Sequence, residues 1–379
     1  MDVRVDRSRF LAEALPMQGI VERRTTIPVL AHLLLRAEGG RLHLAATDLD
    51  VSLTSWCEAD VAAEGAIAIQ AKKFLEIIRS LTGDEVHLVQ DEPRELSIRA
   101  GASRFKIHGL PPEDFPTLPK VDEEYRVEIP FPELRRMIGK ILFAVSSEES
   151  RFQLNGALLK IGDGSLELVA TDGHRLALVE SRIEGLAKEG ARAGAGEAGG
   201  RDDAVLVPRK ALQELQRFES EEPVGYRRGE HHLSFRLGHR ELICRILEGT
   251  FPDYERVIAR DNDKKVVFDR RTLADAVKRV ALLTGERARA VRLAFAPDEL
   301  VVSAVNPDLG EATERVECDY AGGEFKLGIN PDYLEDFLAA VDSDRVRLEL
   351  KDENTQTVGY PEDGGEAGRY LCVIMPMRI

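Results

Sequence analysis

The chain has 379 residues, which is more than one ordinary hydrophobic core contains and fits two or three domains. Hydrophobic residues make up 43% and charged residues 31%, a globular composition, while 67 acidic against 52 basic residues give a formal charge of -15. This charge argues against a protein that coats nucleic acid by bulk charge, because such binding needs basic residues to displace phosphate counterions.

The chain shows no sign of a membrane segment or a metal site. No window approaches the roughly 18 apolar residues of a membrane span, and the beginning of the chain has no signal-like apolar stretch. The four cysteines are far apart and form no CxxC pair: Cys57, Cys244, Cys318 and Cys372. We therefore expect a cytoplasmic protein with no membrane partner, no cofactor, no metal and no disulfide framework.

The chain contains an internal repeat. Residues 41–53 read RLHLAATDLDVSL, residues 165–178 read SLELVATDGHRLAL, and a weaker third copy, ELVVSAVNPDLGEA, begins at Glu299. Each copy is followed by a β-like run, a helical pattern and a hydrophobic element that closes on a proline: Pro116, Pro252 or Pro376. The repeat predicts three tandem domains over 1–122, 123–257 and 258–379, with a Gly/Ala-rich loop at 185–204 in the second.

Apolar residues at three- and four-residue spacing predict two helices in each copy. The first helix of each copy covers 7–21, 131–145 or 270–283, and the second follows a β-like stretch within 65–81, 204–218 or 324–341. Period-two alternation predicts strands such as 95–101, 232–238 and 345–351. Two helices on antiparallel sheet in each copy give an α+β fold.

The helices are richer in basic residues than the net charge suggests. The exception is the last helix, where Asp332, Glu335 and Asp336 stand without a base. If the other five helices share a face, they form a basic lining in an acidic protein. The alternative is that these bases are only the solvated side of amphipathic helices. No aromatic cluster, recognition helix or finger motif accompanies them, so we expect phosphate contact without base readout.

Few residues point to catalysis. The chain has no GxxxxGK[ST], GxGxxG, GxSxG or HExxH motif. His231, His232 and His239 lie in an alternating strand whose neighbouring side chains point to opposite faces, which disfavours a metal site. The string from Thr171 to Arg175 combines an acid, an imidazole and a guanidinium, yet its counterparts in the other copies indicate a turn.

Four short strings in the sequence carry a resemblance to a known family. They are TTIPVLAHLLL from Thr25, ATDGHRLAL from Ala170, FPDYERVI from Phe251 and VIMPMRI from Val373. With them, the chain resembles the bacterial β sliding clamp family, the processivity subunit of DNA polymerase III, along its whole length. The resemblance implies a non-catalytic head-to-tail homodimer that closes into a six-domain ring around duplex DNA without reading its sequence.

The resemblance also implies a pocket that receives short hydrophobic peptides of the polymerase III alpha subunit, the clamp-loader delta subunit, other polymerases and repair proteins. The matching residues are Leu154, Thr171, Gly173, His174, Arg175, Leu176, Pro252, Arg256, Val257, Val373, Ile374, Met375, Pro376 and Met377. Methionine adaptability and a few polar anchors suit a cleft for varied peptides. The bland alternative is that 373–377 is simply a buried last strand.

Two further sets follow, one for DNA and one for the dimer. Arg24 and Arg151 match loops that contact DNA in the family, and the helical bases are added as candidates for the lining of the ring: Lys72, Lys73, Arg79, Arg135, Arg136, Lys140, Arg209 and Lys210. The dimer contact maps to Phe105 and Ile107 at one end and to Leu282 and Leu283 at the other.

Two departures from the family and two rival functions remain. Glu148 and Glu149 place acid in the second DNA loop, which weakens the case for that loop, and the loop 185–204 is long for the family. One rival is a monomeric scaffold that binds peptides in the same pocket and never encircles DNA. The other is a hydrolase that uses His174 with Asp172.

Overall fold

The structure is a computed structural model. It describes residues 1–22, 26–121, 126–162, 164–184, 186, 203–285, 289–362 and 368–378, with only the backbone at 126, 149 and 203. The described chain divides into two compact units. The first contains 1–135 and 210–246, and the second contains 136–186, 203–209 and 247–378.

Within the described residues, the first unit is built on one antiparallel sheet in the order β10-β15-β16-β17-β4-β3-β2-β6-β9-β8-β7-β1-β5. Its strands are β1 (Asp2–Asp6), β2 (His32–Glu38), β3 (Arg41–Thr47), β4 (Val51–Glu58), β5 (Asp60–Ala63), β6 (Gly65–Gln70), β7 (Glu85–Glu92), β8 (Glu95–Ala100), β9 (Ser103–Leu110), β10 (Arg126–Ile129), β15 (Val224–Arg228), β16 (His232–Leu237) and β17 (Arg240–Arg245). β17 pairs with β4, so strands of the second sequence copy extend the sheet of the first.

Three helices of the first copy pack on this sheet: α1 (Arg7–Ala14), α2 (Met17–Ile20) and α3 (Ala71–Ser80). The predicted helix 7–21 is divided at Pro16, because proline has no N–H to donate and clashes with the preceding turn. Phe10 of α1 meets Phe74 of α3 edge to face, with ring centroids 5.8 Å apart. The Gln70 side chain accepts from the backbone N of Lys73 at 2.8 Å and so caps α3.

The second unit holds an antiparallel sheet in the order β14-β11-β12-β13-β25-β24-β23-β18 and a smaller one in the order β21-β20-β19-β22. The strands are β11 (Gly156–Ile161), β12 (Ser165–Thr171), β13 (Arg175–Arg182), β14 (Asp203–Pro208), β18 (Lys264–Asp269), β19 (Val291–Ala296), β20 (Glu299–Asn306), β21 (Gly310–Glu317), β22 (Phe325–Ile329), β23 (Arg345–Leu350), β24 (Thr357–Pro361) and β25 (Tyr370–Ile374). Because β13 pairs with β25, this larger sheet also joins two sequence copies.

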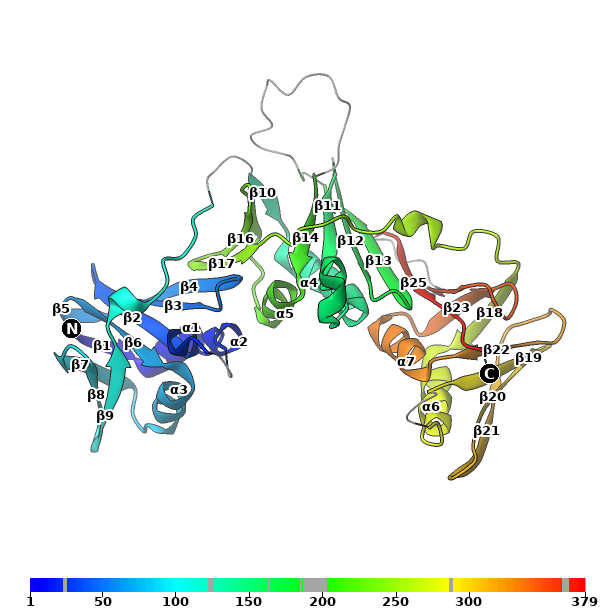
Figure 1. Cartoon of the computed structure of the whole chain (residues 1–379), viewed down its shortest axis with the longest axis horizontal. Coiled ribbons are helices and arrows are strands. Elements are labelled where there is room, and N and C mark those ends of the chain that lie inside the picture. Colours follow the sequence, from blue (N-terminus) through cyan, green and yellow to red (C-terminus); the bar gives the residue numbers. More distant parts are fainter. Residues whose placement is uncertain are drawn as a thin grey trace, which may run out of the picture. The chain divides into compact units, whose positions relative to one another are not determined.

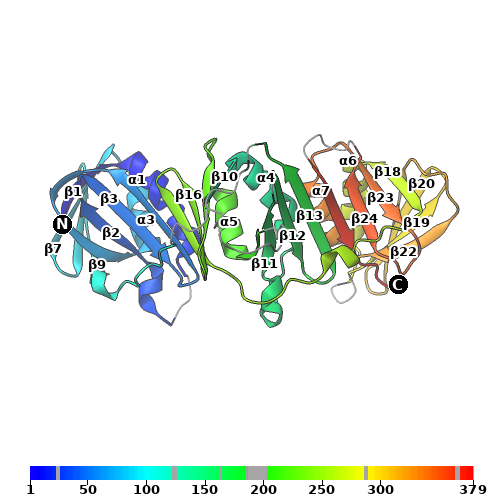
Figure 2. The same ribbon diagram turned by 90° about the horizontal axis from the view of Figure 1, so that it is seen from above.

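Helices α6 (Arg270–Ala281) and α7 (Pro331–Ala340) pack against each other in the second unit (Figures 1 and 2). Asp269 caps α6 by accepting from the backbone N of Thr272 at 2.8 Å, and Asn330 caps α7, which has Pro331 at its first position. Helix α4 (Phe131–Ile141) is shorter than predicted and passes into a 3-10 turn, η3 (Leu142–Ala144). α5 (Arg209–Arg217) lies in the run 204–218, where the sequence predicts a β-like stretch followed by a helix.

Candidate functional site

The turn between β12 and β13 is fixed by its own side chains. The Asp172 carboxylate accepts from the backbone N of His174 at 2.9 Å and of Arg175 at 3.0 Å. The Thr171 hydroxyl donates to the Arg175 carbonyl at 2.6 Å and accepts from the backbone N of Gly173 at 3.1 Å. Gly173 has φ +89°, a left-handed conformation that a side chain at this position would strain. The turn therefore presents His174, which is exposed, in one defined place.

The last strand lies directly beside this turn. In the register of β13 with β25, Arg175 is opposite Ile374 and Leu176 is opposite Val373. Beyond the strand, the backbone N of Met375 donates to the carbonyl of His174 at 2.9 Å. Val373 and Ile374 are 1% exposed, whereas Met375 is 37% exposed. The buried-strand alternative thus describes the first two residues, and the chain reaches the surface at Met375.

The segment that leads to β18 forms a third wall. We call residues 247–262 the strap; in Figure 1 it is the yellow-green segment that runs past β11, β12 and β13. Its residues Tyr254 and Ile258 are buried, and Phe251 and Val257 are partly buried on the same apolar cluster. The sheet contributes Leu158, Val169, Leu176, Leu178, Leu206, Val358, Leu371 and Val373 to that cluster. The strap therefore covers one face of the larger sheet.

The fourteen predicted pocket residues all lie in the second unit. Leu154 ends the 3-10 turn η4 (Glu149–Leu154), one group lies on the β12–β13 turn and β13, one on the strap, and one on β25 and the residues after it. Val257 of the strap, Leu176 of β13 and Val373 of β25 meet in one cluster. We use the name cleft for this surface, where the strap packs on the β13–β25 pair and where the peptide pocket was predicted. It joins buried apolar residues to the exposed His174, Met375 and Arg256.

The Arg175 guanidinium is engaged by partners within the protein. It donates to the Asp172 carboxylate at 3.0 Å, to the Asp336 carboxylate at 2.5 Å and to the Phe143 carbonyl at 2.6 Å, and it lies 4.4 Å from the centroid of Tyr333. Its side chain is 11% exposed. Burial alone would lower the pKa of Arg175, but the contacts with Asp336 and Asp172 raise it. Arg175 thus connects the turn to α7.

Sequence reasoning missed Tyr333 and the partners of the acidic helix. The His174 ring lies nearly parallel to the Tyr333 ring, with centroids 6.5 Å apart. On the same helix, Asp336 pairs with Arg175, and Asp332 pairs with Arg289 at 3.0 Å. Asp332 and Asp336 are therefore counter-charges for bases that lie far away in the sequence, which no local pattern could indicate.

The predicted DNA-contacting residues that the structure describes fall into two groups: the exposed bases of α3, and bases elsewhere that have partners within the protein. Lys72, Lys73 and Arg79 are exposed on α3, where Lys73 pairs with Glu76 at 2.6 Å. Lys72 and Arg79, but not Lys73, border a cavity of about 350 Å³, which is also lined by Gln18, Val21, Glu22, Ala31, Gln70 and Glu76. Arg24 lies outside the described residues, as does most of the loop 185–204.

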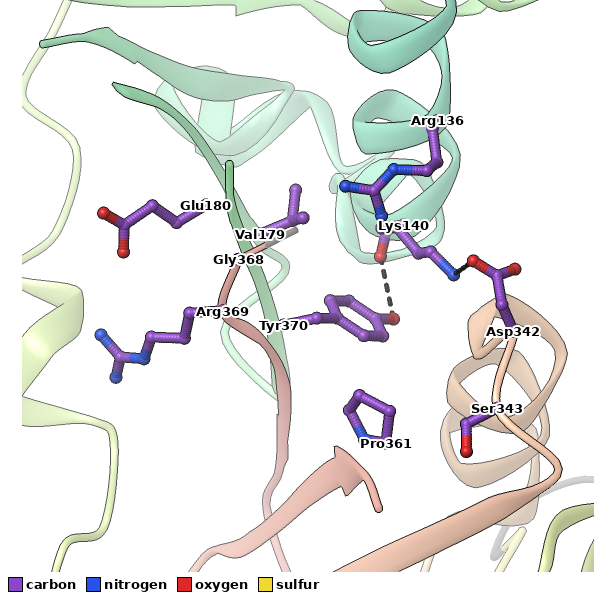
Figure 3. Close-up of a pocket in the computed structure, with 10 residues that line it drawn as sticks. All are labelled: Arg136, Lys140, Val179, Glu180, Asp342, Ser343, Pro361, Gly368, Arg369 and Tyr370. Atoms are coloured by element: carbon purple, nitrogen blue, oxygen red, sulfur yellow. Dashed lines mark hydrogen bonds and ion pairs between the residues drawn. The ribbon is translucent and has the colours of Figure 1, made fainter. Parts of the chain in front are cut away.

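Lys140, which the sequence places in the DNA-contacting set, has partners within the fold. Its ammonium donates to the Ala340 carbonyl at 2.5 Å and to the Asp342 carboxylate at 2.6 Å, and the side chain is 7% exposed. Figure 3 shows it beside a cavity of about 280 Å³, where the Tyr370 hydroxyl donates to the Lys140 carbonyl at 3.1 Å. A base that is buried and paired in this way stabilises the fold and does not offer its charge to a phosphate. Arg136 lines the same cavity.

Lys210 is also used within the protein. Its ammonium donates to the Ile20 carbonyl at 2.6 Å and to the Asp48 carboxylate, so it ties α5 to the first copy. Arg209 donates to the Val145 carbonyl at 3.0 Å. Hydrogen bonds inside the first unit therefore engage the Lys210 ammonium.

Two further bases of the DNA set have partners within the protein. Arg135 donates to the Gln216 carbonyl at 3.1 Å. Arg151 is exposed, donates to the Asp172 carbonyl at 3.1 Å and lies 3.6 Å from the Glu148 carboxylate, while the Glu149 side chain is outside the described residues. Next to Arg151, Phe152 is 54% exposed, an aromatic residue that the sequence analysis passed over.

Phe105 and Ile107 of the predicted dimer contact lie on β9, which pairs with β6 only at 109–110, and Leu282 and Leu283 lie just beyond α6. β9 bonds to β8 along 103–108, and β21 bonds to β20 along its length and is the terminal strand of its sheet. Phe105 of β9 is 38% exposed, and Leu282, just beyond α6, is 76% exposed. Exposed apolar side chains of this size beside an edge strand are typical of an interface.

Two further observations concern the histidines considered as metal ligands and the question of a membrane span. His239 lies 3.1 Å from the Glu13 carboxylate, and its ring is 5.0 Å from that of Trp56, whereas His231 lies beside Glu230. Within the described ranges, every helix is too short or too polar to cross a lipid bilayer.

Comparison with known proteins identifies the family. Models of the N-terminal, central and C-terminal domains of the DNA polymerase III beta subunit match residues 1–119, 128–253 and 255–378. The chain is 36% identical to the beta sliding clamp of Pseudomonas aeruginosa over 384 residues and 38% identical to that of Caulobacter vibrioides over 389, each covering 100% of both chains. A crystal structure of the DNA polymerase sliding clamp from Pseudomonas aeruginosa with ligand superposes with a TM-score of 0.90 at 35% identity, over 100% of both chains.

The chain belongs to the DNA polymerase III beta subunit family, the sliding clamps. Members of this family are non-catalytic processivity factors, so the resemblance predicted from the sequence is confirmed and the hydrolase reading loses its basis. The α+β fold with three clamp repeats is also confirmed.

Proposed function

We propose that this chain forms a homodimeric ring around duplex DNA in the cytoplasm and holds polymerases there through the cleft. The observation that carries the peptide-binding part is the position of the exposed His174 and Met375 beside the partly buried Val257 and the apolar cluster on which it packs. An apolar cleft with a few polar groups at its margin suits short hydrophobic peptides. The alpha subunit, the loader delta subunit, other polymerases and repair proteins are the proposed donors of such peptides.

The proposed DNA contacts follow from exposure. Lys72, Lys73 and Arg79 on α3 are exposed, and Arg151 is exposed beside Phe152, so these bases can reach phosphates. Arg24, Arg135, Arg136 and Arg209 remain in the proposed set from the sequence. A ring that is held by topology needs only weak phosphate contacts, so a small set of exposed bases is enough.

The proposed dimer contact pairs the β9 edge of one chain with the β21 edge of another. Phe105 and Ile107 on β9 would meet Leu282 and Leu283 of the second chain. The two edges have complementary charge: β9 carries Arg104, Lys106 and His108, and β21 carries Glu311, Glu314 and Glu317 with Arg315. Because the two edges are different, the contact is head-to-tail and closes only when a ring is completed. The proposed repeat boundaries stay at 1–122, 123–257 and 258–379.

Two measurements test this function. Light scattering after size exclusion at micromolar concentration should give a dimer, and a labelled peptide of the Gln-Leu-x-Leu-Phe type should bind with an anisotropy change that unlabelled peptide reverses. A monomer that binds the peptide would support the scaffold rival. A dimer that binds no peptide would remove the assigned role of the cleft.

A further inference from the structure

One wall of the cleft has little regular structure of its own. The strap, residues 247–262, carries Pro252, Arg256 and Val257, and the regular element within it is the 3-10 turn η5 (Tyr254–Arg256). A segment without a ladder of backbone hydrogen bonds is positioned by its side-chain contacts with the surface beneath it. The contacts of the strap with the sheet therefore decide where Pro252, Arg256 and Val257 lie relative to β13 and β25.

Tyr254 makes the most extensive of these contacts. The residue is 6% exposed, its ring packs in the apolar cluster of the sheet, and Phe251 meets it edge to face at 6.3 Å. Its hydroxyl donates to the Glu167 carboxylate at 2.6 Å and accepts from the Lys160 ammonium. Its carbonyl accepts from the backbone N of Val257 at 3.0 Å, so the position of Tyr254 is transmitted to a residue of the cleft.

The two partners of the Tyr254 hydroxyl, Lys160 and Glu167, also pair with each other. Lys160 of β11 and Glu167 of β12 are directly opposite in the strand register, and their charged groups lie 3.1 Å apart. Opposite charges in a directly facing cross-strand pair stabilise each other. The Lys160 ammonium also lies 4.7 Å from the centroid of the Tyr254 ring. Two neighbouring strands thus fix one hydroxyl from two sides.

The tether keeps its protonation state at neutral pH. Burial, together with the hydrogen bond to Glu167, raises the pKa of Tyr254 to about 12, so the hydroxyl stays protonated and donates. Burial by itself would lower the pKa of Lys160, but the bonds with Tyr254 and Glu167 outweigh it and the pKa is raised. The three groups therefore act as a permanent anchor.

We propose that Tyr254, Lys160 and Glu167 are positioning residues that set the width of the cleft and so select the size of the hydrophobic side chain that a peptide places there. This inference rests on the proposed peptide-binding function. Without the tether, the strap keeps its apolar packing but gains freedom to shift along the sheet. A wall that shifts accommodates large and small side chains alike, so selectivity falls together with affinity.

The test is the variant Tyr254→Phe, which keeps the ring and removes the hydroxyl. Two synthetic peptides are compared in anisotropy titrations, one ending in Phe and the other, otherwise identical, ending in Leu. We expect the variant to bind the Phe peptide about three- to tenfold more weakly, the effect of one net hydrogen bond, and the ratio of the two affinities to fall toward one. A purely structural loss would weaken both peptides by the same factor.

Tyr320→Phe is the matched control. Tyr320 is 5% exposed, and its hydroxyl donates to the Gly323 carbonyl at 2.9 Å, beside Phe295 and Phe325 of the smaller sheet. This variant loses an equivalent hydroxyl outside the strap, so both affinities and their ratio should match those of the unsubstituted protein. If Tyr254→Phe does not fold, Lys160→Met, which leaves the hydroxyl–carboxylate bond, should lower the ratio in the same direction.

The outcomes separate this inference from the function on which it rests. If the unsubstituted protein binds neither peptide, the proposed peptide-binding function is wrong. If it binds both and a folded Tyr254→Phe or Lys160→Met variant keeps the same affinities and the same ratio, the positioning role is overturned. An equal loss for both peptides also overturns it.

Discussion

The Arg175 guanidinium and the Asp336 carboxylate lie 2.5 Å apart, although 161 residues separate them in the chain. The contact joins the β12–β13 turn of the second sequence copy to α7 of the third. Arg175 is nearly buried there, and its three partners engage the whole guanidinium. The turn that presents His174 is therefore held in place by the third copy.

Replacing Arg175 should lower stability as well as peptide affinity. Arg175→Ala leaves the Asp172 carboxylate, which is 18% exposed, without its charged partner. We expect the free energy of unfolding to fall by about 3 kcal/mol in urea titrations, because one member of a largely buried pair is lost. Arg289→Ala is the control, since the Arg289–Asp332 pair is largely exposed and its loss should cost at most about 0.5 kcal/mol. Equal effects of the two substitutions would contradict the anchoring role of Arg175.

The salt dependence of DNA affinity tests which of the predicted DNA-contacting bases reach the duplex. Lys72→Ala with Lys73→Ala removes two exposed charges, so the slope of log affinity for duplex DNA against log salt should become shallower by about 2. Lys140→Met should leave that slope unchanged and lower the thermal midpoint, because Lys140 bonds to Ala340 and Asp342 within the fold. A shallower slope for Lys140→Met would restore Lys140 to the DNA-contacting set.

Two buried carboxylates of the first unit should shift stability with pH in opposite directions. Burial raises the pKa of Glu214, so this residue favours folding below its unfolded pKa, and that contribution is lost as pH rises through the folded pKa. Burial also opposes ionisation of Glu13, but its bonds with Arg240 and Ser55 lower its pKa overall. The contribution of Glu13 is present above its unfolded pKa and is lost as pH falls through the folded pKa.

Replacing each glutamate by glutamine, which has nearly the same shape, separates the effects of Glu214 and Glu13 on stability. Glu214→Gln should raise the free energy of unfolding at pH 7, because the buried Oε2 atom has no hydrogen-bond partner and an amide needs no desolvation of charge. Glu13→Gln should lower it by about 2 kcal/mol, because Glu13 loses its charge-assisted bonds with Arg240 at 2.8 and 2.9 Å. Denaturant titrations between pH 4 and pH 8 measure both effects. The same sign for both substitutions would contradict this assignment.

The end of the chain offers a test that separates the cleft from the dimer contact. Deleting residues 375–379 removes Met375, whose backbone bonds to His174, and should abolish peptide binding. The dimer should persist in light scattering, because β9 and β21 do not include these residues. Loss of both properties would show that the end of the chain also supports the dimer.

The sequence predicted the helices and the turn well because both depend on local pattern. Apolar spacing places α6 within a few residues of its observed bounds, and α3, α5 and α7 lie inside the runs where a strand followed by a helix was predicted. The repeated Ala-Thr-Asp string marks the turn because Thr171 and Asp172 bond to backbone groups only a few residues away. The first helix was predicted as one piece where two exist, because the apolar spacing continues through Pro16, and the helix predicted at 131–145 ends in the 3-10 turn η3.

The tertiary use of individual charges could not be predicted in this way. Lys140 and Lys210 look like exposed helical bases in the sequence, but Asp342 and Asp48 bind them from distant positions. The pairing of β17 with β4 and of β13 with β25 is likewise absent from the repeat, because a repeat describes each copy and not the edges at which copies join.

Retention on circular DNA tests the central claim most directly. The protein is loaded by a clamp loader onto a nicked circular plasmid, isolated by gel filtration, and the plasmid is then cut once with a restriction enzyme. A ring that encircles the duplex should stay on the circle through the column and leave the linear product by sliding off its ends. Equal retention on circular and linear DNA would contradict topological binding and the clamp function proposed for this chain.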